Sequence, residues 1–119
     1  MSTDIPAGDA TLLLERDIPS FAWLVIVTGA RRGRLIRLRV AGSTLGRASE
    51  NDIVVDDPAT SRHHARFTVE LASSGQRFVI HDLASANGIF VNGNRVSRCE
   101  LTDEDRIVIG ETTYAFKQL

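Results

Sequence analysis

The sequence has very little of what cross-links a small protein or anchors it in a membrane. Its only cysteine is Cys99, which excludes an internal disulfide and favours a reducing compartment. The longest apolar run, residues 21–27, is far shorter than the roughly 20 residues that span a bilayer. The first residues also lack the basic and apolar regions of a secretory signal. We therefore expect a cytoplasmic protein without a membrane segment.

Net charge is also nearly absent, with a formal charge of -1 at pH 7 and an isoelectric point near 6.3. Such a chain has no global attraction to nucleic acid or to an anionic membrane surface. Arginines are nevertheless crowded into residues 31–47, where no acidic residue occurs. They alternate with Ile36 and Leu38, and no aromatic residue for base stacking lies between them. This pattern favours the solvated face of a strand over a nucleic-acid site.

The 119 residues are enough for one domain but not for two. Residues 1–20 begin with small and polar side chains and include Pro6, Gly8 and Pro19. We interpret this segment as a flexible N-terminal tail. The pattern changes at Phe21, and residues 21–119 are predicted to form a single domain, which we expect to be a monomer.

Short stretches of alternating apolar and polar residues predict strands rather than helices. Residues 36–40 and 66–71 alternate in this way, as strands with one buried face do. Residues 21–27 are almost all apolar, which predicts a strand that is buried on both faces. Asn92-Gly93 predicts a two-residue hairpin turn, because both residues tolerate a positive φ. Together these features predict an all-β protein, an antiparallel β-sandwich.

Polar residues suited to ligand binding gather in the predicted loops. Arg47 follows an apolar strand end, where a guanidinium can hold a phosphate through charge-assisted hydrogen bonds. In later loops Ser61 and Arg62 can add a hydroxyl and a second cation, and Asn87 can bond the backbone of a ligand. Ordinary structural roles stay open for each of them: a solvated arginine, a turn hydroxyl or an Asn that bonds its own turn. Gly88 is expected to supply a backbone geometry that other residues cannot reach.

The histidines raise two further alternatives, an enzyme and a metal site. Ser61, His64 and Asp82 contain the side chains of a hydrolytic triad, but no nucleophile-elbow sequence surrounds Ser61. The histidines and the single cysteine match no zinc-ligand spacing. We therefore expect no enzyme activity, no metal and no cofactor, and we interpret His64 as a residue that bonds loop backbone.

The order of the polar segments is more informative than any one of them. A Gly-Arg pair is followed by a Ser-x-x-His group and then by an Asn-Gly pair, with a further apolar-Gly step near the end. The segments are Leu45-Gly46-Arg47, Asn51-Asp52-Ile53-Val54-Val55, Ser61-Arg62-His63-His64-Ala65 and Asn87-Gly88-Ile89-Phe90-Val91-Asn92-Gly93. In order and spacing this set resembles the signature of the forkhead-associated (FHA) domain, over roughly residues 21–119.

The resemblance implies an FHA/SMAD-like β-sandwich of about eleven strands, which binds phosphothreonine peptides with loops at one end. The implied function is that of a signalling adaptor in a Ser/Thr kinase pathway, whose partner is a phosphothreonine-containing protein. Carried over by position, the phosphate ligands would be Arg47, Ser61 and the auxiliary Arg62. The residues beside the peptide would be Asn87 and Ala86. The residues that keep the loops in shape would be Gly46, His64 and Gly88.

Two positions depart from the family pattern. Ala86 stands where many members have Thr or Ser, which removes a polar contact worth about 1 kcal/mol. Ala59 stands where some members have a basic residue that reads an acidic ligand residue, so an aliphatic ligand residue is expected instead. Because Ala86 makes the pocket less polar, a second hypothesis stays open: an FHA-like scaffold that binds a protein partner independently of phosphate.

Thr11 in the N-terminal tail is a candidate regulatory phosphosite. Some bacterial members of the family bind their own phosphorylated tail, so the partner can be the chain itself. Leu14 follows three residues later and supplies the aliphatic residue expected above. The competing interpretation is a tail with no regulatory role.

Overall fold

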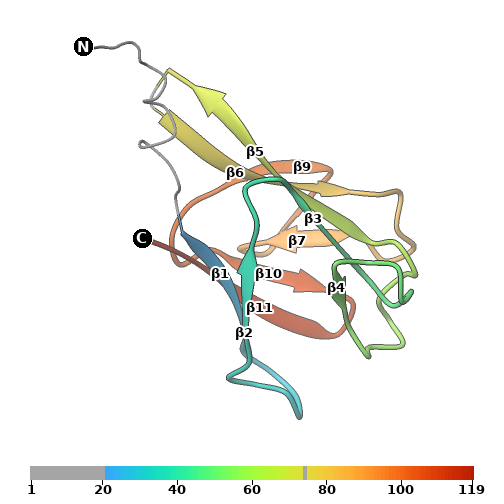
Figure 1. The fold of residues 1–119 in the computed structure, drawn as a ribbon. Coiled ribbons are helices and arrows are strands. Elements are labelled where there is room, and N and C mark those ends of the chain that lie inside the picture. The colour runs from blue at the N-terminus through green and yellow to red at the C-terminus, as the bar shows by residue number, and fades with distance from the viewer. Residues whose placement is uncertain (1–20, 74) are drawn as a thin grey trace, which may run out of the picture.

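Two β-sheets packed face to face form the domain (Figure 1). The computed structural model describes residues 21–73 and 75–119, and within these ranges it contains eleven strands and no helix. The six-stranded sheet has the order β2-β1-β11-β10-β7-β8, and the five-stranded sheet has the order β4-β3-β5-β6-β9. The strands are β1 (Ala22–Ile26), β2 (Leu35–Leu38), β3 (Ser43–Gly46), β4 (Ile53–Val54), β5 (Ala65–Ala72), β6 (Gly75–Asp82), β7 (Ile89–Val91), β8 (Asn94–Val96), β9 (Arg98–Leu101), β10 (Arg106–Ile109) and β11 (Thr112–Gln118). The predicted all-β sandwich is therefore confirmed. The predicted tail, residues 1–20, lies outside the described residues.

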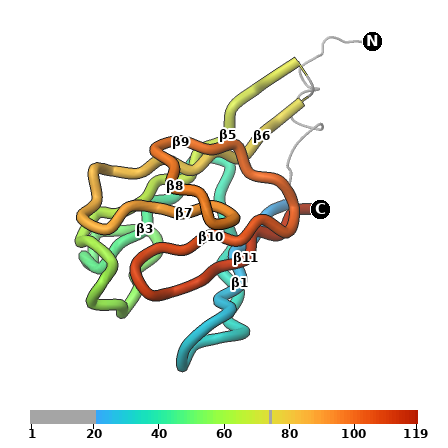
Figure 2. Tube along the Cα trace, turned by 180° about the vertical axis from the view of Figure 1, so that it is seen from behind, coloured from blue at the N-terminus to red at the C-terminus, as the bar shows by residue number. Residues whose placement is uncertain are grey.

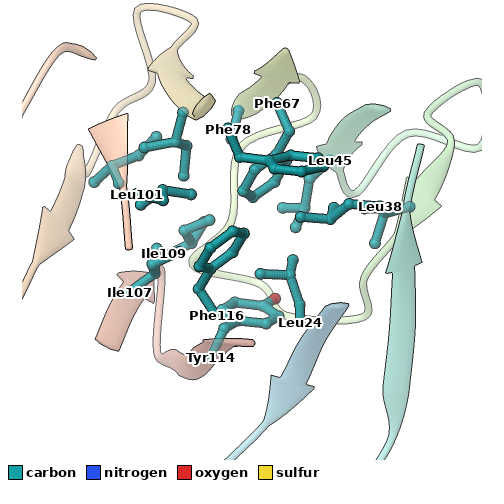
Figure 3. Packing of buried hydrophobic residues seen from close by; sticks show 14 of the residues in the cluster. Leu24, Leu38, Leu45, Phe67, Phe78, Leu101, Ile107, Ile109, Tyr114 and Phe116 are labelled. Atoms are coloured by element: carbon teal, nitrogen blue, oxygen red, sulfur yellow. The ribbon is translucent and has the colours of Figure 1, made fainter. Parts of the chain in front are cut away.

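The core lies between the sheets and is built from every second side chain of the strands. Phe78 from the five-stranded sheet and Phe116 from the six-stranded sheet meet there, with ring centroids 5.8 Å apart. Figure 3 shows this packing, to which both sheets contribute. The largest fully buried side chains are Tyr114, Phe67, Phe78, Phe116, Leu24, Leu45, Ile80, Ile89, Leu101, Ile107, Ile109 and His64.

The outer faces of the strands correct three expectations about burial. In β1, Trp23 and Val25 are only half-buried, so this strand is buried on one face and not on both. Val40 lies beyond the end of β2 and is 41% exposed. Leu71 is 78% exposed, because the β5–β6 hairpin extends past the rest of the sandwich and has no opposing sheet there (Figures 1 and 2). Alternation in the sequence therefore predicted these strands, but it did not show where the rest of the protein stops burying their side chains.

The connections between strands follow the local sequence with one exception. Asn92 and Gly93 have φ values of 50° and 86° and join β7 to β8, which confirms the predicted two-residue turn. All strand pairs are antiparallel except β3 with β4, where Leu45 is the partner of Ile53 in a parallel register. The short loop between these two strands brings the chain back beside Leu45, so that both strands run in the same direction.

Candidate functional site

Three loops meet at one end of the sandwich, and we call them the site loops: residues 47–52, 55–64 and 83–88. They follow β3, β4 and β6, and they lie side by side in both views (Figures 1 and 2). Hydrogen bonds between residues far apart in the sequence join them. All the loop residues that the sequence singled out between 46 and 88 lie on these loops or at their ends.

Arg47 is held by the backbone of the second site loop. Its N–H donates to the carbonyl oxygen of Ser61 at 3.1 Å, and its Nε donates to the carbonyl oxygen of Thr60 at 2.6 Å. The side chain is exposed, and no residue in the described part of the chain accepts a hydrogen bond from its terminal nitrogens. The guanidinium is therefore oriented through Nε, while its Nη groups keep their hydrogen-bonding capacity for an anion.

Ser61 links the second site loop to the third. Its Oγ accepts the backbone N–H of Ala86 at 3.1 Å, across 25 residues of sequence. The hydroxyl proton is left to donate, since an accepted N–H occupies only a lone pair of the oxygen. Ala86 contributes its backbone alone, because its side chain has no polar atom.

His64 is fully buried and uses both ring nitrogens. Nδ1 accepts the N–H of Ser61 at 2.9 Å, so the ring proton sits on Nε2, which donates to the carbonyl oxygen of Gly88 at 2.8 Å. Asp82 bonds the hydroxyl of Ser85 instead of the histidine. Ser61, His64 and Asp82 are thus not arranged as a hydrolytic triad, which requires the imidazole to bond the hydroxyl of the serine.

Gly46 allows the first two site loops to touch. A Cβ at this position would lie 2.1 Å from the carbonyl oxygen of Arg62. That oxygen accepts the N–H of Ala48 at 3.1 Å and the Nδ2 of Asn51 at 2.8 Å. The side chain of Arg62 is exposed, so its backbone holds the loops together while its guanidinium remains at the surface.

Asn87 and Gly88 form the turn of the third site loop. Asn87 is exposed, and its Nδ2 donates to the carbonyl oxygen of Ala59 at 2.8 Å, which leaves Oδ1 and the second amide hydrogen. Gly88 has a φ of 80°, a value that favours glycine. Its N–H donates to Ser85 Oγ at 2.9 Å, and Ser85 Oγ donates to Asp82 Oδ1 at 2.5 Å.

Asp57 supports the second site loop, and the sequence analysis did not select it. The residue is only 7% exposed, and its carboxylate accepts the N–H of Ala59 at 2.8 Å, the N–H of Glu111 at 2.9 Å and the Oγ1–H of Thr112 at 2.8 Å. Burial by itself raises the pKa of Asp57, but the hydrogen bonds outweigh it and hold the pKa below its ordinary value.

Asn51 and Ser85 also escaped the sequence analysis as individual residues. Asn51 is buried, and its Nδ2 bonds the carbonyl oxygens of Ala48 and Arg62, at 2.8 Å each. The only signal for Asn51 was its place in the signature segment, and Ser85 had none beyond its place in a polar loop. Such roles depend on contacts between loops, which the sequence pattern does not show.

A cleft of about 700 Å³ opens beside Arg47. The loop between β1 and β2 lines it with Arg31 and Arg34, and Asp57 and Pro58 line it from the second site loop. Arg47 therefore borders both the site loops and an open groove.

Residues 21–73 and 75–119 hold neither a metal-ligand cluster nor a membrane-spanning helix. No group of at least three His, Cys, Asp or Glu side chains in these ranges is placed to hold a metal ion. Nor do these ranges contain a helix that is long and apolar enough to cross a membrane.

Comparison with known proteins identifies a protein family whose model covers the site loops. The family model of the FHA domain matches residues 43–110. The transcriptional regulatory protein EmbR of Mycobacterium tuberculosis is 35% identical over 113 residues, which cover 93% of this chain and 28% of EmbR. The glycogen accumulation regulator GarA of the same species is 34% identical over 98 residues, which cover 82% of this chain and 58% of GarA. The chain thus spans between about a quarter and three fifths of the length of these relatives.

Solved structures of FHA domains share this fold. One, from a study of phosphothreonine-dependent FHA domain interactions, superposes with a TM-score of 0.72 at 28% identity and covers 82% of this chain and 95% of that chain. EmbR in complex with a low affinity phosphopeptide superposes with a TM-score of 0.71 at 34% identity and covers 90% of this chain and 28% of that chain. Residues 43–110, matched by the family model, include all three site loops.

Proposed function

Because this chain belongs to the FHA domain family, we propose that it is a phosphothreonine-dependent protein-binding module. It would act as a signalling adaptor that recognises proteins phosphorylated by a Ser/Thr kinase. One observation carries the proposal: the backbone of Thr60 and Ser61 holds Arg47 in place, so that a guanidinium and the Ser61 hydroxyl lie on adjoining loops. The ligand class is supported by the FHA structure from the study of phosphothreonine-dependent interactions and by EmbR in complex with a phosphopeptide.

Phosphate chemistry assigns a role to each group at this place. A phosphothreonine carries about -1.5 to -2 charges at pH 7 and several strong acceptor oxygens. The Nη groups of Arg47 would hold it through charge-assisted hydrogen bonds, and the Ser61 hydroxyl would donate a further one. Arg62 would add a second cation from the same loop as Ser61. No metal is needed for this binding, because the donors already match the charge and the acceptors of the phosphate.

The peptide backbone would be held next to the phosphate. Asn87 keeps Oδ1 and one amide hydrogen after its bond to Ala59, which suits it to bond a ligand main chain. Ala86 would lie beside the peptide without a polar contact. The residues that would keep this surface in shape are Gly46, His64 and Gly88.

The remaining parts of the proposal concern partners and activity. The module would bind a phosphothreonine-containing protein as a cytoplasmic monomer, without catalysis of its own. Thr11, the candidate phosphosite for binding to its own tail, lies outside the described residues and stays a prediction.

The test is a titration with three degenerate peptide libraries that carry a fixed phosphothreonine, phosphoserine or threonine. We expect binding to the phosphothreonine library alone. Arg47→Ala should abolish it, because a phosphate covered by the bound peptide and left without its charge partner costs about 2–5 kcal/mol. Arg37→Ala is the matched control, since Arg37 lies on β2 over the ring of Phe21. Binding that Arg47→Ala leaves undiminished would contradict the site. Binding of a protein partner without phosphate would support the scaffold hypothesis instead.

A further inference from the structure

The guanidinium of Arg95 lies directly against Gly88. A Cβ at Gly88 would be 2.6 Å from Arg95 Nε and 2.8 Å from Arg95 Cζ. Gly88 is buried although it lies in a surface loop, whereas Arg95 itself is exposed. Glycine is therefore required here for a second reason besides its positive φ, because any side chain would displace the arginine.

Strand register defines the face on which Arg95 lies. Arg95 on β8 is the direct partner of Phe90 on β7, so both side chains lie on the same face of the six-stranded sheet. Ile89 and Val91 are buried in the core, which puts Phe90 and Arg95 on the outer face. Gly88 precedes Phe90 by two residues, and Arg95 thus reaches diagonally toward the Asn87–Gly88 turn.

No acidic group in the described part of the chain neutralises Arg95. Two other exposed arginines do have such a partner: Arg39 pairs with Asp52 at 2.7 Å and Arg98 pairs with Glu70 at 2.5 Å. The salt bridges within residues 21–73 and 75–119 do not include Arg95. The carboxylate of Asp82, under the same turn, is already bonded to Ser85. Arg95 is thus a free cation that is packed against the turn bearing Asn87.

We propose that Arg95 is a specificity-determining residue that selects an Asp or Glu side chain of the bound phosphopeptide. The inference rests on the proposed function, because it needs a peptide held at Asn87. A guanidinium can bond both oxygens of a carboxylate at once. Contact with Gly88 already restricts the Arg95 side chain, so it loses less conformational entropy when it binds a carboxylate. Ala59, whose carbonyl oxygen accepts Asn87 Nδ2, brings no charge of its own. Arg95 on β8 would therefore provide the positive charge that is missing at Ala59 in the second site loop.

The experiment is an acidic scan of one phosphothreonine peptide. The parent has alanine at every flanking position, and a single Asp is moved from the fourth residue before the phosphothreonine to the fourth residue after it. Kd is measured for the unaltered protein, for Arg95→Gln and for Arg37→Gln. The last variant loses the same charge at the opposite edge of the same sheet, since β2 and β8 are its two edge strands.

We expect Asp at one position to tighten binding about two- to fivefold, the range of an exposed ion pair. This gain should weaken as salt is added. It should persist in Arg37→Gln and disappear in Arg95→Gln, while all three proteins bind the parent phosphopeptide equally well. An identical scan for Arg95→Gln and the unaltered protein would overturn the inference and leave the proposed function standing. If the parent binds no better with phosphate than without it, both fail together.

Discussion

The imidazole of His64 and the carbonyl oxygen of Gly88 are 2.8 Å apart and join two site loops across 24 residues of sequence. The other ring nitrogen accepts the N–H of Ser61, so one buried side chain connects the proposed phosphate ligand to the Asn87–Gly88 turn. Such a residue affects binding without touching the ligand, because it keeps two ligand-bearing loops at a constant separation.

Replacing His64 should therefore weaken the fold and the site together. We expect His64→Ala to lower the free energy of unfolding by about 3 kcal/mol, since it leaves a cavity and two unpaired backbone groups. Urea unfolding followed by the fluorescence of Trp23, the only tryptophan, measures this change. His63→Ala is the control, because His63 is exposed and its loss should cost less than about 0.5 kcal/mol. Equal effects of the two substitutions would contradict the role of His64.

Gly46→Ala should be among the most damaging single-methyl changes in the domain. The added Cβ would lie 2.1 Å from the carbonyl oxygen of Arg62, and backbone cannot move aside as cheaply as a side-chain tip. We expect a loss of about 3 kcal/mol in unfolding free energy.

Gly29→Ala separates this steric effect from backbone strain. Gly29 has a φ of 85°, but no atom lies within 4 Å of a Cβ placed there. The strain alone should cost about 1 kcal/mol. If urea midpoints show Gly29→Ala to be the more damaging of the two, the close approach at Gly46 is not what requires glycine there.

Ala86→Ser should strengthen phosphothreonine binding. The substitution keeps the backbone N–H that Ser61 Oγ accepts at 3.1 Å and adds a hydroxyl beside the proposed phosphate site. One hydrogen bond is worth about 1 kcal/mol, or roughly a fivefold lower Kd. Calorimetry with the all-alanine phosphopeptide measures it, and the unphosphorylated peptide is the control. An unchanged Kd would mean that the Ala86 side chain does not face the phosphate.

Acid should remove the stabilising contribution of Asp57. Its hydrogen bonds place the pKa of the folded state below the ordinary value of 3.8, so the folded protein binds fewer protons than the unfolded chain in the range between the two values. The stability that Asp57 contributes is therefore complete above about pH 4 to 5 and is lost as the pH falls through the folded pKa. Asp57→Asn should be clearly less stable than the unaltered protein at pH 6, and the difference should shrink toward pH 3.

Urea midpoints at both pH values provide this comparison. Asp56→Asn is the matched control, because Asp56 is exposed, and its difference from the unaltered protein should stay small at either pH. A gap for Asp57→Asn that is equally large at pH 3 and pH 6 would contradict the assignment.

Local pattern alone was enough to predict several of the strands and one turn. The alternation of residues 66–69 identified part of β5 and its buried Phe67, since successive side chains of a strand point to opposite faces whatever surrounds them. Asn92 and Gly93 specified the turn between β7 and β8 for an equally local reason, their tolerance of positive φ. The order of the Gly-Arg, Ser-x-x-His and Asn-Gly groups predicted the family, which the match over residues 43–110 confirms.

Only the tertiary structure decided how the site is held together. The carboxylate of Asp57 bonds Thr112 across 55 residues, and the guanidinium of Arg95 covers Gly88 from the neighbouring strand. These contacts depend on where loop backbones meet after the two sheets have packed. The periodicity of the sequence does not show these contacts, because the groups in contact lie on different loops and strands. Residue types in the sequence thus determined which chemistry was present at one end of the domain, and folding determined which of those groups are already bonded and which remain free for a ligand.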